Sequence, residues 1–310
     1  MSDERQNYLP DFFAETLVKD YGASTAAAIL AGCETRRKTS LRANTLKASR
    51  EEIAQALQDA NIAAFQPPFY ADAFVLEEAR EKDIWNLEAY EQGKLYMQSL
   101  SSMIPPLVLG APAGCDILDM CAAPGGKTCQ LAALSGKQAH ISACEMVTPR
   151  AQKLRYNLDK QGATNVNVMQ QDSRKLDEFF SFDRILLDAP CSGSGTLYAA
   201  SPKVAKTFTP KLVAKCLKQQ AALLAKGLTL LKPGGTLVYS TCSILKEENE
   251  AQVEKALRHV RKQGSFALEA IDPADFPDVP LLPCTLDGSL CVAPDEYYEG
   301  FFVCRIKRLS

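Results

Sequence analysis

Short helical and strand patterns alternate in the N-terminal third of the chain. The pattern of apolar and polar positions predicts helices at residues 8–21 and 50–60 and strands at residues 39–46 and 73–76. Ser49 and Glu52 have the spacing of a capping box, so the second helix should begin directly after Ser49. Residues 1–95 are therefore predicted to form a small α+β domain.

After Pro105 and Pro106 the pattern changes to strands that alternate with helices. Buried strands are predicted at residues 117–119, 139–145, 166–169, 184–188 and 236–240. Helices are predicted from Thr128 and at residues 149–162, 211–231 and 247–263. Such alternation predicts an α/β fold, a doubly wound and mostly parallel sheet covered on both faces, over residues 96–310. Residues 265–270 and 301–306 look like two edge strands.

Composition and charge narrow the class of protein. A chain of 310 residues suggests about two domains. No apolar run approaches the ~18–20 residues of a membrane span, and residues 1–7 lack the basic-then-apolar pattern of a signal peptide. A cytoplasmic protein without membrane contact is therefore expected. The net charge of -2 argues against a protein coated in positive charge, but it allows a local basic groove.

Cysteine is abundant and histidine is scarce, with 11 Cys and 2 His. An odd number of cysteines without an export signal disfavours a disulfide framework. No two cysteines have C-x-x-C spacing, and His140 and His259 are far apart, so no metal site is expected. A Ser-His or Cys-His catalytic pair is also disfavoured. The chemistry is expected to use cysteines, carboxylates and a cofactor.

Polar residues stand at the ends of the predicted parallel strands, where doubly wound sheets bind ligands. These residues are Asp119, Glu145, Asp172, Asp188 and Cys242. The Gly125-Gly126 turn lets a ligand approach the backbone closely, but it matches neither the dinucleotide fingerprint nor the phosphate loop. A carboxylate-rich pocket suits a ligand that carries positive charge and a nucleoside, and S-adenosylmethionine fits this description. The alternative is that the acids only cap helices and the glycines only turn the chain.

Three motifs carry a family resemblance. Residues 119–128 (Asp-Met-Cys-Ala-Ala-Pro-Gly-Gly-Lys-Thr), 188–195 (Asp-Ala-Pro-Cys-Ser-Gly-Ser-Gly) and 239–243 (Tyr-Ser-Thr-Cys-Ser) resemble the Sun/Nop (RsmB/Nop-like) family of S-adenosylmethionine-dependent RNA cytosine-5 methyltransferases. The resemblance spans nearly the whole chain and implies a class I methyltransferase, Rossmann-like fold with S-adenosylmethionine as cofactor. It implies that the cofactor contacts Cys121, Ala122, Ala123, Pro124, Gly125, Gly126, Lys127, Glu145, Asp172 and Asp188.

The reaction explains why two cysteines stand in polar turns. C5 of cytosine is a poor nucleophile, so methylation there needs a covalent nucleophile that adds at C6, and a thiolate suits this role. Cys191 and Cys242 both follow strands of the predicted sheet, and their sequence positions leave open which one attacks. The resemblance implies that Cys242 attacks, that Cys191 assists product release and that Asp188 interacts with N3.

The same resemblance implies an RNA partner, with ribosomal RNA as first and transfer RNA as second expectation. It implies that Arg42 and Asn44 bind RNA. Further basic candidates are residues 36–38, the run Lys203, Lys206, Lys211, Lys215 and Lys218, and the group Arg150, Lys153 and Arg155. Paired arginines often follow the Gly-Ser-Gly turn in the family, whereas residues 196–202 contain none.

Two other functions compete with this interpretation. An amino-group methyltransferase would need a Pro-Pro-Tyr type of turn in place of residues 188–191. A catalytically inactive RNA-binding ribosome-assembly factor of the same fold is disfavoured because Asp188, Cys191 and Cys242 are all present. The sequence leaves the oligomeric state open, with a monomer as the expectation.

Overall fold

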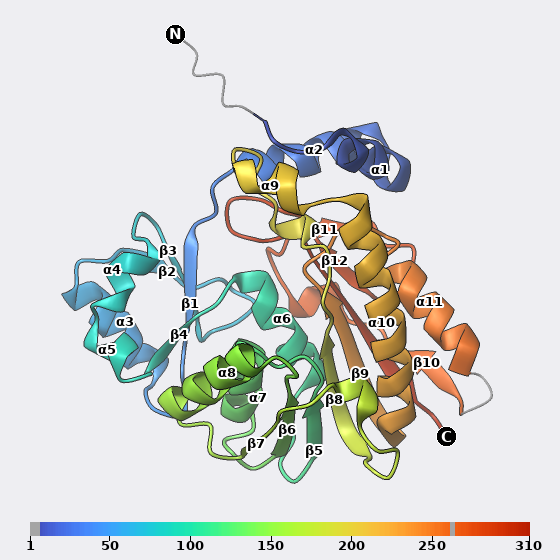
Figure 1. Ribbon diagram of the computed structural model, residues 1–310. Helices are drawn as coiled ribbons and strands as arrows, with labels where there is room; N and C mark the ends of the chain where they lie inside the picture. The colour runs from blue at the N-terminus through green and yellow to red at the C-terminus, as the bar shows by residue number, and fades with distance from the viewer. Residues whose placement is uncertain (1–6, 261–263) are drawn as a thin grey trace.

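The computed structural model describes residues 7–260 and 264–310 (Figure 1). Within these ranges, nine strands form the larger sheet, in the order β11-β12-β13-β9-β8-β5-β6-β7 with β10 paired to β13. The parallel strands are β5 (Asp116–Asp119), β6 (His140–Cys144), β7 (Val166–Met169), β8 (Phe182–Asp188) and β9 (Leu231–Thr241). The remaining strands pair antiparallel and are β10 (Phe266–Leu268), β11 (Leu281–Leu282), β12 (Leu290–Val292) and β13 (Phe301–Arg308).

Helices cover both faces of this sheet (Figure 1). Along β8, Ile185 and Leu187 pack into one core and Leu186 into the other, because successive side chains of a strand point to opposite faces. The first core includes α1 (Asp11–Tyr21), α2 (Ala23–Glu34), α10 (Pro210–Leu230) and α11 (Glu250–His259). The second includes α6 (Leu100–Leu109), α7 (Gly126–Leu134) and α8 (Thr148–Gln161). The predicted doubly wound sheet is confirmed.

A second, antiparallel sheet in the described N-terminal region has the order β2-β3-β1-β4. Its elements are β1 (Thr39–Ala43), α3 (Arg50–Asp59), β2 (Ala64–Phe65), β3 (Ala73–Leu76), α4 (Glu81–Trp85), α5 (Glu88–Glu91) and β4 (Leu95–Met97). The capping box is confirmed, because Ser49 Oγ accepts from the Glu52 amide at 3.1 Å while the Glu52 carboxylate accepts from the Ser49 amide at 2.7 Å. This small sheet has its own hydrophobic core.

The two N-terminal helices pack on the larger core, away from the small sheet. The rings of Phe12 and Phe13 lie 5.2 and 5.3 Å from that of Phe208, which follows α9 (Pro202–Thr207). The division of the chain into residues 1–95 and 96–310 stays a prediction. No helix among the described residues is both long and apolar enough to cross a membrane.

Two sequence predictions need correction. Residues 301–306 are not an edge strand, because β13 lies between β9 and β12. The three-residue β12 was not predicted from the sequence. The last predicted helix is shorter, at Glu250–His259, and its predicted residues 261–263 lie outside the described residues.

The helix α6 was not expected, because a Pro-Pro pair normally interrupts a helix. The carbonyl of Ser102 cannot bond to Pro106, but it accepts from Gln98 Nε2 at 3.0 Å instead.

Candidate active site

The polar residues at the strand ends lie along one edge of the sheet. Asp119 ends β5 and Asp188 ends the adjacent β8, and the connections run in opposite directions from this pair of strands. Such a switch point is where doubly wound sheets hold their ligands. Cys242 follows β9 on one side of the pair, and Glu145 and Asp172 follow β6 and β7 on the other side.

The glycine turn after β5 forms one wall of a cavity of about 180 Å³. Gly125 has a φ of 111°, in the left-handed region that favours glycine, and it directly precedes α7. A Cβ at Gly126 would lie 2.9 Å from Tyr96 Cε1, so the turn passes too close to β4 for a side chain. Residues 121–124, Gly126 and Lys127 line this cavity together with Asp119 and Asp188.

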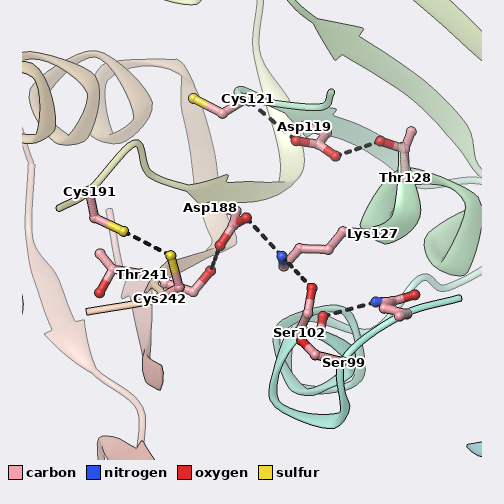
Figure 2. A network of polar contacts seen from close by, with 12 residues as sticks. Ser99, Ser102, Asp119, Cys121, Lys127, Thr128, Asp188, Cys191, Thr241 and Cys242 are labelled. Carbon is pink, nitrogen blue, oxygen red and sulfur yellow. Dashed lines mark hydrogen bonds and ion pairs between the residues drawn. The ribbon is translucent and has the colours of Figure 1, made fainter. Parts of the chain in front are cut away.

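Lys127 links the glycine turn to the catalytic candidates, as Figure 2 shows. Its Nζ donates to Asp188 Oδ2 at 2.8 Å and to Ser102 Oγ at 2.7 Å. Burial alone would lower the pKa of Lys127, but the Asp188 carboxylate raises it more, so the amine stays protonated. Asp188 Oδ1 accepts from Ser240 Oγ at 2.9 Å, which fixes the carboxylate between two strands and a helix.

The two cysteines of the polar turns lie in contact. Their Sγ atoms are 3.2 Å apart, although the residues are 51 positions apart in sequence (Figure 2). The thiol–thiol hydrogen bond to Cys242 and burial raise the pKa of Cys191 well above its ordinary value. Cys191 therefore favours its protonated form.

A buried carboxylate that the sequence did not indicate lies behind these thiols. Glu248 is fully buried, and its oxygens accept from the amide and hydroxyl of Ser192, from Ser243 Oγ at 2.7 Å and from Gln220 Nε2 at 3.0 Å. Ser192 follows Cys191 directly, and Ser243 follows Cys242 directly. Nothing in the local sequence signals this arrangement, because the donors come from three separate segments.

Asp119 is a second buried carboxylate, at the floor of the cavity. Thr128 Oγ donates to its Oδ2 at 2.7 Å, and the Cys121 amide donates to its Oδ1 at 3.3 Å (Figure 2). Burial raises the pKa of Asp119 to about 6 despite these donors. The protein therefore holds an ionised carboxylate here at a cost in stability.

Glu145 and Asp172 already have partners. Glu145 is buried, accepts from the Val147 amide at 2.8 Å and lies 3.1 Å from Arg150 Nη1. Arg174 donates from Nε to Asp172 Oδ1 at 2.9 Å and from Nη2 to Asp172 Oδ2 at 2.7 Å, and these hydrogen bonds lower the pKa of Asp172. Both carboxylates are held in fixed orientations by these partners.

Arg42 and Asn44 lie in the interior and hold the small sheet against the glycine turn. Arg42 is fully buried and donates to Gln98 Oε1 at 2.9 Å and to the Gly126 carbonyl at 3.2 Å. Asn44 is 1% exposed and its amide donates to the carbonyls of Gly93 and Gln161, both at 2.8 Å. This burial is contrary to the expectation that the two side chains contact RNA.

The remaining cysteines lie mostly in the interior, and one of the predicted basic residues binds the protein itself. Of the eight cysteines other than Cys121, Cys191 and Cys242, six are buried, and Cys115 and Cys284 are partly exposed. Among the described residues, no group of three or more His, Cys, Asp or Glu side chains could hold a metal ion. Arg37 of the 36–38 segment donates to the carbonyls of Gly195, Thr196 and Tyr298, so it binds the protein's own backbone.

A doubly wound sheet whose first parallel strand leads into a glycine turn beside a row of carboxylates is the fold of a class I methyltransferase. The family model described as 16S rRNA methyltransferase RsmB/F matches residues 107–307. A second model, described as the ferredoxin-like domain of RsmF/B-like methyltransferases, matches residues 9–82. The chain belongs to the RsmB/F methyltransferase family, as the sequence motifs predicted.

Individual relatives agree with this assignment. The ribosomal RNA small subunit methyltransferase F of Shewanella oneidensis is 34% identical over 288 residues, which cover 90% of this chain and 59% of that protein. The chain thus spans about three fifths of this curated relative's length.

Two solved structures are also similar. The crystal structure of a methyltransferase homolog protein from Pyrococcus horikoshii is 31% identical, has a TM-score of 0.79 and covers 97% of this chain and 100% of that one. The NSun6 structure from the same organism is 22% identical, has a TM-score of 0.85 and covers 98% of this chain and 99% of that one, and it shows the fold alone.

Proposed function

We propose that this chain is an S-adenosylmethionine-dependent RNA (cytosine-5) methyltransferase with ribosomal RNA as its substrate class. The observation that carries the proposal is the contact between Cys191 and Cys242, 3.2 Å apart at the strand ends beside Asp188. Two thiols are what a mechanism of covalent attack and later release requires. Transfer RNA is the second substrate candidate. A cytoplasmic monomer, with RNA binding by residues 1–95 and catalysis by residues 96–310, completes the proposal.

The pocket fits the proposed cofactor. The turn from Cys121 to Lys127 offers a close approach to backbone, and the Gly125-Gly126 pair keeps side chains out of the way. Glu145, Asp172 and Asp188 would hold the ligand together with this turn, and Asp119 adds a buried negative charge that suits a cation. S-adenosylmethionine supplies an activated methyl group.

The protein's own residues would carry the steps on cytosine. The Cys242 sulfur bonds to C6 as its proton is lost and N3 gains one, and the Asp188 carboxylate accepts the resulting N3–H hydrogen bond. After C5 is methylated, the C5 proton leaves to solvent water, the electron pair of that C–H bond forms the C5–C6 double bond as the S–C6 bond breaks, and the N3 proton returns to the released Cys242 sulfur. Cys191 assists this elimination. The raised pKa of Cys191 supports this assignment, because a thiol that keeps its proton is a poor attacking group.

Two variants test the roles. Each protein is incubated with S-adenosylmethionine and transcripts of small-subunit ribosomal RNA or of transfer RNA, and is then run on a denaturing gel. Cys242→Ala should show neither methyl transfer nor a protein–RNA adduct, whereas Cys191→Ala should accumulate the adduct. An adduct in Cys242→Ala alone would reverse the two roles.

The inactive assembly factor makes a different prediction for the wild-type protein. It would bind the transcripts without methylating them, and it would not be trapped on RNA that contains 5-azacytidine. Trapping of the wild-type protein would therefore exclude this alternative.

A further inference from the structure

Positive charge is concentrated in one segment of a chain that is acidic overall. Residues 189–246 contain eight Lys and no Asp, Glu, Arg or His, so this segment carries a formal charge of +8, and the rest of the chain carries -10. The segment begins at the Cys191 turn, passes through α9 and α10 and ends just after the Cys242 turn. The positive charge thus lies on the segment that joins the two cysteine turns.

Five of these lysines are exposed and make no ion pair or side-chain hydrogen bond with a described residue. They are Lys203, Lys206, Lys211, Lys215 and Lys218, named below the lysine face. The other three are neutralised or occupied: Lys226 pairs with Glu178, Lys232 pairs with Asp116 and Asp183, and Lys246 lies over the Tyr21 ring. The lysine face therefore has uncompensated charge available for a polyanion.

The lysines of α10 form a row on the exposed side of the helix, whose other side is attached to the Cys191 turn. Lys211, Lys215 and Lys218 are four and then three residues apart, so they share one side of the helix. They line a groove of about 610 Å³ with Thr209, Leu212, Ala214 and Gln219. Gln220 lies on the opposite, buried side of the same helix and donates to the carbonyl of Pro190, the residue before Cys191. The lysines of α10 therefore form a solvent-facing row roughly 10 Å long, on the side of the helix away from the Cys191 turn.

We propose that the lysine face binds phosphates of the RNA that flanks the cytosine entering the active site. The inference rests on the proposed function and adds the surface on which the substrate lies. Lysine suits phosphate as a point charge that needs no fixed geometry. Contacts to neighbouring phosphates would help to offset the cost of flipping a base out of its stack, a few kcal/mol. The chain has no paired arginines after the Gly-Ser-Gly turn, and the lysine face would supply positive charge in their place.

The test measures binding of a fluorescently labelled single-stranded RNA of about 20 nucleotides against salt concentration. The triple variant K211Q/K215Q/K218Q should bind at least about tenfold more weakly near 0.1 M salt, and its slope of log K against log salt should be shallower by about 2. Lys226→Gln, on the same helix but already paired with Glu178, is the matched control and should bind like the wild type. K211R/K215R/K218R should restore binding.

The binding measurements distinguish failure of the lysine face from failure of the proposed function. Equal affinity and equal slope for the triple variant and the wild type would overturn the lysine face, while failure of the wild type to bind RNA would instead overturn the proposed function. Stronger wild-type binding to anionic phosphatidylglycerol vesicles than to the RNA would also overturn the proposal. Circular dichroism verifies that each variant is folded.

A separate observation concerns the distance between the two thiols. The Glu248 carboxylate binds the residue after Cys191 and the residue after Cys242, and its neighbour Asn249 accepts from Thr241 Oγ1 at 2.6 Å and donates to the Ser243 carbonyl at 2.9 Å. Two turns from different strands are thus fixed to one short segment at the start of α11. We infer that Glu248 is a positioning residue that holds the thiols in register for successive attack and release, given the proposed function.

The two serines allow the two halves of this arrangement to be tested separately. Ser192→Ala removes a hydroxyl from the Cys191 turn and should slow product release about tenfold, so the protein–RNA adduct accumulates. Ser243→Ala removes a hydroxyl from the Cys242 turn and should slow adduct formation about tenfold. Glu248→Gln should slow both steps, because an amide cannot accept all of these donors. Glu247→Gln changes the adjacent exposed carboxylate and should behave like the wild type.

Single-turnover rates of adduct formation and decay on an RNA that the wild type methylates distinguish positioning from stability. Variants that melt at lower temperature but keep both wild-type rates would overturn the role of Glu248. If the wild type forms no adduct on any RNA, the proposed function itself fails.

Discussion

Asp119 offers a quantitative test of the pocket's electrostatics. Its pKa is about 6 in the folded protein against an ordinary 3.8, so the folded state binds this proton more tightly than the unfolded state. Below the unfolded pKa both states are protonated and the carboxyl costs nothing. As pH rises through 3.8 toward 6 the unfolded chain ionises first, so folding stability is lost over that window. Between about pH 4.5 and 7.5 the loss is about 2 kcal/mol.

The variant Asp119→Asn removes this titration and keeps the shape. Its Oδ1 can accept from the Cys121 amide, and its Nδ2 can donate to Thr128 Oγ, so both present neighbours keep a partner. Urea unfolding followed by circular dichroism near pH 4.5 and 7.5 gives the free energy of unfolding of each protein. The variant should gain about 2 kcal/mol relative to the wild type over that range.

The difference between the two proteins isolates Asp119, because every other titrating group is shared. Asp59→Asn, an exposed carboxyl on α3, serves as control and should follow the wild-type pH dependence. Parallel pH profiles for Asp119→Asn and the wild type would show that the carboxyl carries no such cost, and the reasoning about the cavity floor would then be wrong.

Three further predictions concern stability. Ser49→Ala removes the acceptor for the Glu52 amide and should lower the free energy of unfolding by about 1 kcal/mol in urea titrations. Gly195→Ala would place a Cβ 1.9 Å from the Gly300 carbonyl oxygen, so a clear drop in melting temperature is expected. Asn44→Ala leaves the carbonyls of Gly93 and Gln161 without this donor and should cost about 2–4 kcal/mol, while the salt dependence of RNA binding stays that of the wild type.

Much of the fold follows from local sequence. Buried parallel strands are typically continuous apolar runs, and the apolar stretches of strands 117–119 and 184–188 each end at an aspartate. The short β12 and the proline-containing α6 could not be predicted, because their stability comes from neighbours that are distant in sequence. For α6 one such neighbour is the Gln98 side chain, whose bond to the Ser102 carbonyl replaces the one that Pro106 cannot make.

Some residues of the site could likewise be predicted from the sequence, and others could not. Cys191, Cys242 and Asp188 could be singled out because reactive residue types follow strand ends. The interior positions of Arg42 and Glu248 could not, since charged side chains are usually exposed and sequence gives no account of which buried partners they will meet. Both act on the site through other residues, Arg42 on the Gly126 carbonyl and Glu248 on the serines beside the thiols.

The ion pairs of the carboxylates at the strand ends indicate which ligand charge the site selects. Glu145, Asp172 and Asp188 are each already paired with a cation, Arg150, Arg174 and Lys127 respectively. A ligand that meets these three carboxylates gains hydrogen bonds, but little net attraction between charges. Asp119 makes no ion pair with a described residue, and its side chain receives only neutral donors. The negative charge that remains to attract a cation is therefore that of Asp119, which favours a ligand with one positive centre near the end of β5 over an anionic nucleotide.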